Sequence, residues 1–123
     1  MTISNTRWIF IKAANAALHE RFPKCFKEIA PIPLKVGIWD DIVSRCPDIP
    51  VKILRTTIAI YVDKIRYQYA LTASANRVDL DGNVAGQVSE EQAEVAAKRA
   101  RKLRRIFYKK KAKEVAAAQE AAE

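Results

Sequence analysis

The sequence predicts an α+β domain that is mainly α-helical and carries one small β-hairpin. Apolar residues recur at helical spacing through most of the chain, and a period of two is confined to residues 77–88. The length of 123 residues suits one domain, and half of the residues are hydrophobic, which is enough for one core. We expect a compact unit over residues 1–113 and a frayed, Ala-rich tail over residues 114–123.

The first helix is expected at residues 4–21. Four apolar side chains fall on one of its faces and can point into the core: Trp8, Ile11, Leu18 and Phe22. Pro23 ends this pattern, because a proline cannot continue a helix. Two further prolines make residues 23–35 an ordered loop rather than a helix or a strand.

Two more helices are expected at residues 37–46 and 50–69. Asp40 and Asp41 lie in the first turns of the shorter one, where the helix dipole favours negative charge. Pro50 suits the first position of the longer one, because that position needs no backbone N–H. The longer helix has an apolar stripe, formed by Leu54, Ile58, Tyr61 and Ile65.

Residues 77–88 are expected to form the β-hairpin, since polar and apolar residues alternate on both sides of the turn sequence Asp81-Gly82-Asn83. Ser89 and Gln92 then have the spacing of a capping box, in which each side chain binds the backbone N–H of the other residue. They open a last helix at residues 90–113, whose inner face is formed by Ala96, Ala100, Leu103 and Phe107.

The positive charge of the chain is concentrated in this last helix. The net charge is +8 and the pI about 9.7, yet residues 98–113 hold ten Lys or Arg and no acid, so the remainder has a net charge of −2. Five of these cations recur at three- and four-residue spacing: Lys98, Arg101, Lys102, Arg105 and Lys109. Such a ladder suits a phosphate backbone, and the alternative is a solvated helix end. We interpret Ile106, Phe107 and Tyr108 as anchors that hold the helix to the core, in preference to the alternative that they stack on bases.

Two weaker patterns also suit a nucleic acid. On the expected helix 50–69, Lys52, Arg55 and Arg66 fall within an arc of about 60°, with small Ala59 between them. Tyr67 follows Arg66 and offers a ring and a hydroxyl, although it could equally be a half-buried core residue. In a separate segment, Lys35 and Gly37 precede a helix, where free backbone N–H groups can bind an anion.

The sequence offers little for catalysis, metal binding or a cofactor. It contains no nucleophile elbow, P-loop, HExxH or glycine-rich phosphate loop, and its one histidine, His19, is expected at the exposed end of the first helix. Cys25 and Cys46 lack metal-ligand spacing and are expected as reduced thiols in the core. No signal peptide or membrane span is evident, so we expect a cytoplasmic protein that is not an enzyme.

Four segments resemble the ProQ/FinO domain in order and spacing. They are Phe22-Pro23-Lys24-Cys25-Phe26, Pro33-Leu34-Lys35-Val36-Gly37-Ile38, Arg66-Tyr67-Gln68-Tyr69 and Arg77-Val78-Asp79-Leu80-Asp81-Gly82-Asn83. The resemblance covers residues 20–100. It implies a compact domain of four to five helices with a small β-hairpin, which lacks the linker and second domain of larger relatives.

The resemblance also implies a function as an RNA chaperone. Members of this family bind small regulatory RNAs and messenger 3′ ends, at the base of a terminator hairpin and its U-rich tail, without ATP. By that resemblance, Tyr67 and Arg77 would hold the terminal nucleotides and the 3′ hydroxyl, with Arg66 nearby. Lys35 and the helix start at Gly37 would hold phosphates. Lys52 and Arg55 would contact the backbone of the RNA duplex.

This chain departs from the family pattern at two positions. Ala59 stands where relatives often carry another cation, and Ile65 stands where they often carry an aromatic residue. The missing cation should weaken contacts with the duplex, and the basic helix could compensate. We expect a monomer that binds RNA and neither a membrane nor a small-molecule substrate. The alternatives are a DNA-binding or nucleoid-type protein without 3′-end recognition, and a protein-interaction or membrane-surface module.

Overall fold

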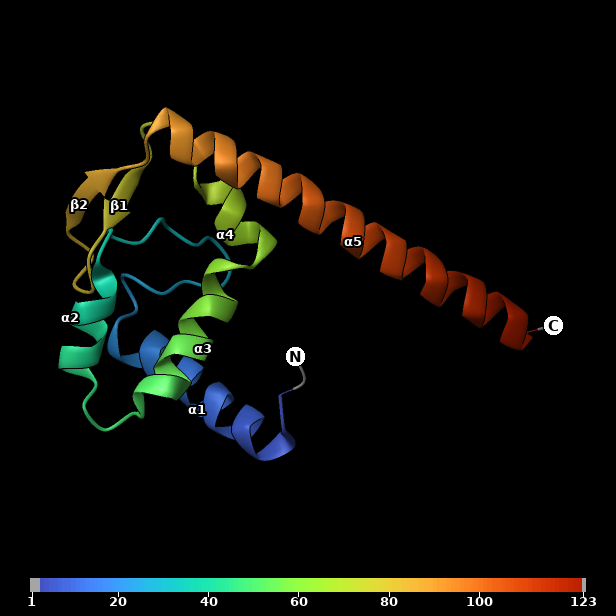
Figure 1. Ribbon diagram of the computed structural model, residues 1–123, viewed down its shortest axis with the longest axis horizontal. Coiled ribbons are helices and arrows are strands. Elements are labelled where there is room, and N and C mark those ends of the chain that lie inside the picture. The colour runs from blue at the N-terminus through green and yellow to red at the C-terminus, as the bar shows by residue number, and fades with distance from the viewer. Residues whose placement is uncertain (1–2, 123) are drawn as a thin grey trace.

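The structure is a computed structural model that describes residues 3–122 (Figure 1). It contains five helices and one two-stranded antiparallel sheet in those residues, which confirms the predicted α+β, mainly helical class. In chain order the elements are α1 (Asn5–Arg21), α2 (Ile38–Arg45), α3 (Val51–Val62), α4 (Ile65–Ala70), β1 (Asn76–Val78), β2 (Val84–Gln87) and α5 (Glu90–Ala122).

Helix α1 begins and ends where the sequence predicts. The Ser4 hydroxyl caps its start by accepting from the Arg7 N–H at 3.2 Å, and the N–H of Phe22 closes its end on the Leu18 carbonyl. Its buried side chains are Ile11, Ala14 and Leu18. Trp8 was expected in the core but is 39 % exposed, because it lies in the first turn of α1 and borders a pocket that it lines with Ile60 of α3.

The expected helix 50–69 is wrong as one element, because the chain breaks between α3 and α4. Asp63 leaves the helix, and Lys64 adopts an extended backbone with ψ of 139°. The Gln68 side chain stabilises this break by donating to the free Val62 carbonyl at 2.6 Å. The arc that placed Arg66 on one face with Lys52 assumed a continuous helix, so that alignment does not hold.

The β-hairpin is confirmed, and the chain before α2 pairs with it. Strands β1 and β2 are antiparallel, and Asp79 Oδ1 stabilises their turn by accepting from the N–H groups of Asp81 and Asn83. Val78 also exchanges backbone hydrogen bonds of 2.9 Å with the segment before α2, accepting from Lys35 and donating to Pro33. The loop that carries Lys35 is thereby fixed to the sheet.

The core lies between α1, α2, α3 and the hairpin. Cys25 and Cys46 are both buried and free, as expected, and burial raises the pKa of the Cys25 thiol to about 12. His19 was expected at an exposed helix end, but it is half-buried, with its ring centroid 5.9 Å from that of Tyr61 and 6.1 Å from that of Phe26. The buried cluster includes Leu18, Phe22, Leu34, Ile42, Leu54, Tyr61, Tyr67 and Leu80.

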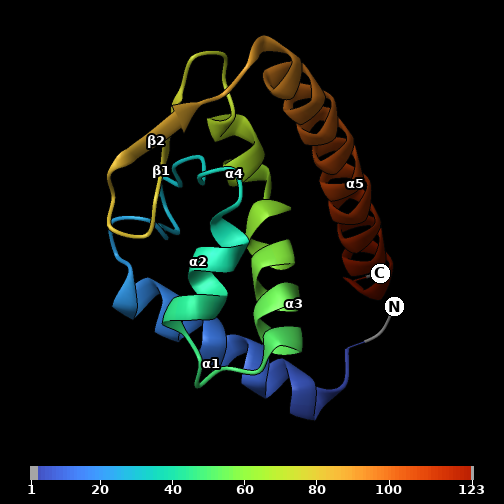
Figure 2. The same ribbon diagram turned by 60° about the vertical axis from the view of Figure 1, so that its left-hand side comes forward.

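Helix α5 opens with the predicted capping box and packs on α4. Ser89 Oγ accepts from the Gln92 N–H at 3.1 Å, and Gln92 Oε1 accepts from the Ser89 N–H at 3.0 Å. Ala96 and Ala100 are buried, but Phe107, expected on the same inner face, is 59 % exposed. The helix continues to Ala122 rather than ending at 113, so the tail expected to fray is helical and stands apart from the other elements (Figures 1 and 2).

Candidate RNA interface

Tyr67 and Arg77 meet at the backbone of Leu34. Leu34 donates its N–H to the Tyr67 hydroxyl at 3.0 Å and accepts from Arg77 Nη1 at 2.7 Å through its carbonyl. Both side chains are almost fully buried, at 5 % and 9 % exposure. Burial raises the pKa of Tyr67, so its hydroxyl stays protonated and available as a hydrogen-bonding group. Two of the expected site residues are thus brought together, but they hold backbone rather than face solvent.

Arg77 connects this backbone to the start of α5. Its Nη2 donates to Gln92 Oε1 at 3.1 Å, so the capping side chain of α5 also fixes the arginine. Its Nε is buried without a hydrogen-bond partner within the described residues. A pocket of about 400 Å³ opens beside it, with Gln68, Glu91 and Gln92 among its lining residues. The arginine therefore borders a pocket that offers both donors and acceptors.

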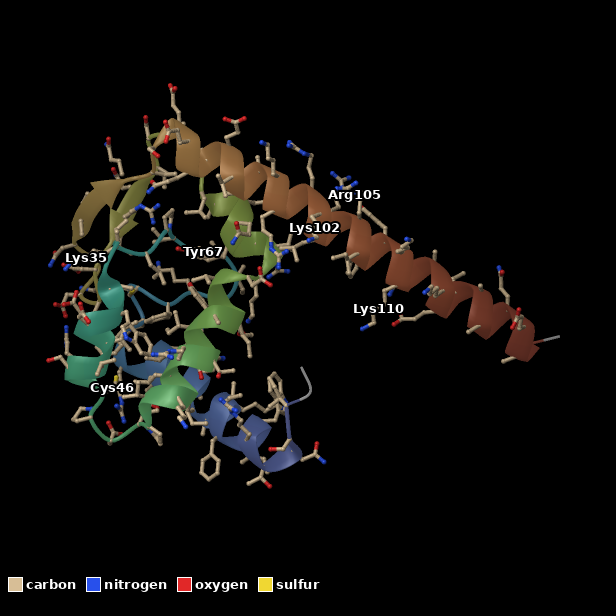
Figure 3. All side chains as sticks on the ribbon, in the orientation of Figure 1. Lys35, Cys46, Tyr67, Lys102, Arg105 and Lys110 are labelled. Carbon is tan, nitrogen blue, oxygen red and sulfur yellow. The ribbon has the colours of Figure 1, made fainter. Side chains whose placement is uncertain are left out.

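Lys35 follows Leu34 and lies at the edge of the body, whereas Tyr67 points inward (Figure 3). Its Nζ is 2.9 Å from the carboxylate of Asp41, a residue of the first turn of α2, and this hydrogen bond raises the pKa of Lys35. Gly37 caps α2 with a left-handed backbone, φ +82°, and a Cβ there would meet nothing within 4 Å. A phosphate bound here would compete with Asp41 for the lysine.

Arg66 is separated from Tyr67, although the two are adjacent in sequence. Tyr67 points into the core, while Arg66 is exposed and lines another pocket with Glu28, Ile29 and Lys64. Successive side chains leave a helix about 100° apart, which accounts for the divergence. The structure therefore does not bring Arg66 to the Leu34 contact, and it remains a cation on a neighbouring surface.

Lys52 and Arg55 are exposed on α3, as expected for contacts with a backbone. The Arg55 guanidinium lies over the ring of Trp39, 5.8 Å from its centroid, so α2 helps to orient it. Neither side chain is paired with a carboxylate among residues 3–122. Both remain candidates for phosphate contacts.

The cations of α5 divide into two groups. Lys98 lies 3.9 Å from Glu94, and Arg99 makes two hydrogen bonds of 2.9 and 2.8 Å to the Asp63 carboxylate, which anchors α5 beside the break between α3 and α4. Arg101, Lys102 and Arg105 are exposed and carry no ion pair in the described part of the chain. Figure 3 shows Arg105 and Lys110 leaving the projecting helix on different sides.

Three contributors to this site were not singled out from the sequence. Leu34 acts through its backbone, which no residue type reveals, and Asp41 was expected only to stabilise its helix. Gln92 was expected only as a cap, yet it also binds Arg77. The one available signal for Gln92 was its residue type, because a polar side chain in a capping box can also bind a second partner.

The described residues offer neither a metal-binding cluster nor a membrane-spanning helix. Within residues 3–122 no three His, Cys, Asp or Glu residues are grouped so that they could hold a metal ion. Of the helices described, none is long and apolar enough to cross a membrane.

Comparison with known proteins gives the same architecture. A FinO-like RNA chaperone from Neisseria meningitidis has a similar fold, with a TM-score of 0.63 and 20 % sequence identity over 73 % of this chain and 71 % of that one. A ProQ homolog from Legionella pneumophila is similar with a TM-score of 0.63 and 28 % identity over 83 % of this chain and 85 % of that one. The model of the ProQ/FINO family matches residues 11–116, and the chain therefore belongs to this family.

Proposed function

We propose that this protein is an RNA chaperone that binds the base of a terminator hairpin together with the single-stranded U-rich tail and its 3′ end. It acts without catalysis, in the cytoplasm, on small regulatory RNAs and messenger 3′ ends. The observation that carries the proposal is the family match over residues 11–116, which contains both the Leu34 contact and the cations of α5. The Neisseria protein of the same fold is described as an RNA chaperone.

The buried pair would act on the RNA in two ways. Tyr67 and Arg77 fix the Leu34 backbone, and this positions Lys35 and the start of α2 for phosphates. Arg77 and Glu91 also both line the pocket beside the start of α5. A ribose hydroxyl can accept from the arginine and donate to the carboxylate, which suits a free 3′ end.

The first experiment compares one terminator hairpin with a 3′ hydroxyl and the same hairpin with a 3′ phosphate. A phosphate would place two negative charges beside Glu91 and could not donate to it, so we expect binding to weaken by about tenfold or more. Affinity is measured by titration of labelled RNA at constant salt. Equal affinity for both RNAs would contradict the 3′-end site.

A second function, general nucleic-acid binding without 3′-end recognition, is favoured by one observation. The exposed cations Arg101, Lys102 and Arg105 lie on a helix that leaves the body, so they could bind any duplex, including DNA. The same experiment separates the two functions, because this alternative predicts equal affinity for the blocked and the free hairpin.

A further inference from the structure

The C-terminal half of α5 has no structural role in the body. Leu103 is the last half-buried residue of the helix, and every described residue from Arg104 to Ala122 is exposed. At 1.5 Å per residue this segment extends about 27 Å. Both ribbon views show it apart from the other elements (Figures 1 and 2).

Apolar side chains nevertheless occur on this exposed segment. Ile106, Phe107 and Tyr108 are 54 %, 59 % and 55 % exposed, which contradicts their interpretation as anchors to the core. The reason is geometric, because α5 passes the start of α4 near Arg99, which binds Asp63, and no described residue of the helix beyond Leu103 is even half-buried. These side chains lie within a stretch of ten cations without an acid.

Two of these three side chains, Phe107 and Tyr108, are aromatic and form a line of groups with Arg104. The Phe107 and Tyr108 ring centroids lie 5.7 Å apart, and the Arg104 guanidinium stands 5.5 Å from the Tyr108 centroid. The Tyr108 hydroxyl, and to a smaller extent that of Tyr69 on α4, raises the pKa of Arg104. Tyr69 is itself 53 % exposed.

We propose that Tyr69, Arg104, Tyr108 and Phe107 form a stacking track for single-stranded RNA, separate from the Leu34 contact. Aromatic rings and an arginine plane stack on unpaired bases of any sequence, while the neighbouring cations Arg101, Lys110 and Lys111 bind the phosphates. A strand that leaves the body at α4 would continue along α5. This inference rests on the proposed RNA-binding function and adds a second site to it.

The charge and the directions of the side chains favour RNA over other occupants. A second copy of the chain would bring its own ten cations against these ten, and lysine is depleted in protein interfaces. A membrane surface needs an apolar face, but three consecutive helical residues point about 100° apart, so Ile106, Phe107 and Tyr108 cannot form one. Rings interleaved with cations suit a ligand that has both phosphates and bases.

The track can be tested with Phe107→Ala/Tyr108→Ala and the matched control Val115→Ala, which removes an equally exposed apolar side chain further along α5. Each hairpin carries a 3′-hydroxyl tail of about 4 or about 16 nucleotides. We expect the longer tail to bind the wild type and the control more tightly, and the double variant to lose at least about fivefold for each ring on that tail alone. The salt dependence should not change, because stacking releases no counterions.

Tryptophan fluorescence gives a second test that does not depend on measured affinities. Phe107→Trp should show tryptophan fluorescence that is quenched when the long-tailed RNA binds, and Val115→Trp should not. Unchanged affinity of the double variant, or equal fluorescence in both tryptophan variants, would overturn the track. So would a concentration-dependent dimer that the double variant abolishes. If the wild type bound neither hairpin, the proposed function itself would be wrong. If the wild type bound both hairpins with equal affinity, only the stacking track would be refuted.

Discussion

In the proposed function, Tyr67 and Arg77 support binding without facing the ligand. Their side chains are buried, and their hydrogen bonds fix both backbone groups of Leu34. The sequence predicted that these residues act together with Lys35, on the strength of the family resemblance. It could not predict the means, because the contacts join residues 33 and 43 positions apart, which only the tertiary fold brings together. The same holds for Asp41, whose pairing with Lys35 depends on the turn at Gly37.

We expect Tyr67→Phe to lower both stability and RNA affinity. The change leaves the buried N–H of Leu34 without an acceptor, which costs about 1–3 kcal/mol of unfolding free energy and loosens the segment that carries Lys35. Urea unfolding and titration with the 3′-hydroxyl hairpin measure the two effects.

Tyr61→Phe is the matched control for this substitution. It also removes a buried hydroxyl that accepts from a backbone N–H, but that N–H belongs to Lys27, at 3.2 Å, and not to Leu34. It should lower stability similarly and leave RNA affinity unchanged. If both variants lost the same affinity, the loss would reflect stability and the role of Leu34 would be refuted.

At the scale of elements, the sequence predicted the helix boundaries that depend on residues nearby in the chain. Pro23 and the Ser89–Gln92 box act within a few residues, and the structure confirms the corresponding end of α1 and start of α5. The break after α3 was missed because no glycine or proline marks it. It depends on the Gln68 side chain and on the pairing of Asp63 with Arg99, a residue 36 positions away.

The turn of the hairpin offers a test of element geometry. Gly82 has φ of +85°, and a Cβ there would lie 2.6 Å from Lys24 Cβ, so Gly82→Ala combines backbone strain with a steric clash. Gly37→Ala is the matched control, because its φ of +82° is nearly the same but its Cβ would meet nothing within 4 Å. We expect about 1–2 kcal/mol of destabilisation from strain in the control and a larger loss for Gly82→Ala. Equal losses in urea unfolding would show that Lys24 moves aside freely.

At the scale of the whole molecule, the excess positive charge lies on the helix that projects from the body. Residues 1–97 have a net charge of +1, and residues 98–113 of the helix that leaves the body carry ten cations. Composition predicted this division, but the length of the projection was not predicted, because an Ala-rich end without tertiary contacts was expected to fray. We therefore expect RNA attraction to come mainly from α5, and the proposed recognition of the 3′ end to take place in the body.

This division predicts that charge reversal on α5 weakens binding to many RNAs alike. Lys102→Glu/Arg105→Glu removes two exposed cations without an ion pair, so the slope of log affinity against log salt should fall by about two if each contacts one phosphate. The control Lys12→Glu/Lys27→Glu makes the same change of net charge on exposed side chains of the body. The control should weaken binding less and keep most of the slope, because its cations lie away from α5. Equal effects of the two double variants would mean that net charge alone attracts the RNA, and a loss confined to one RNA would mean that α5 reads a particular sequence.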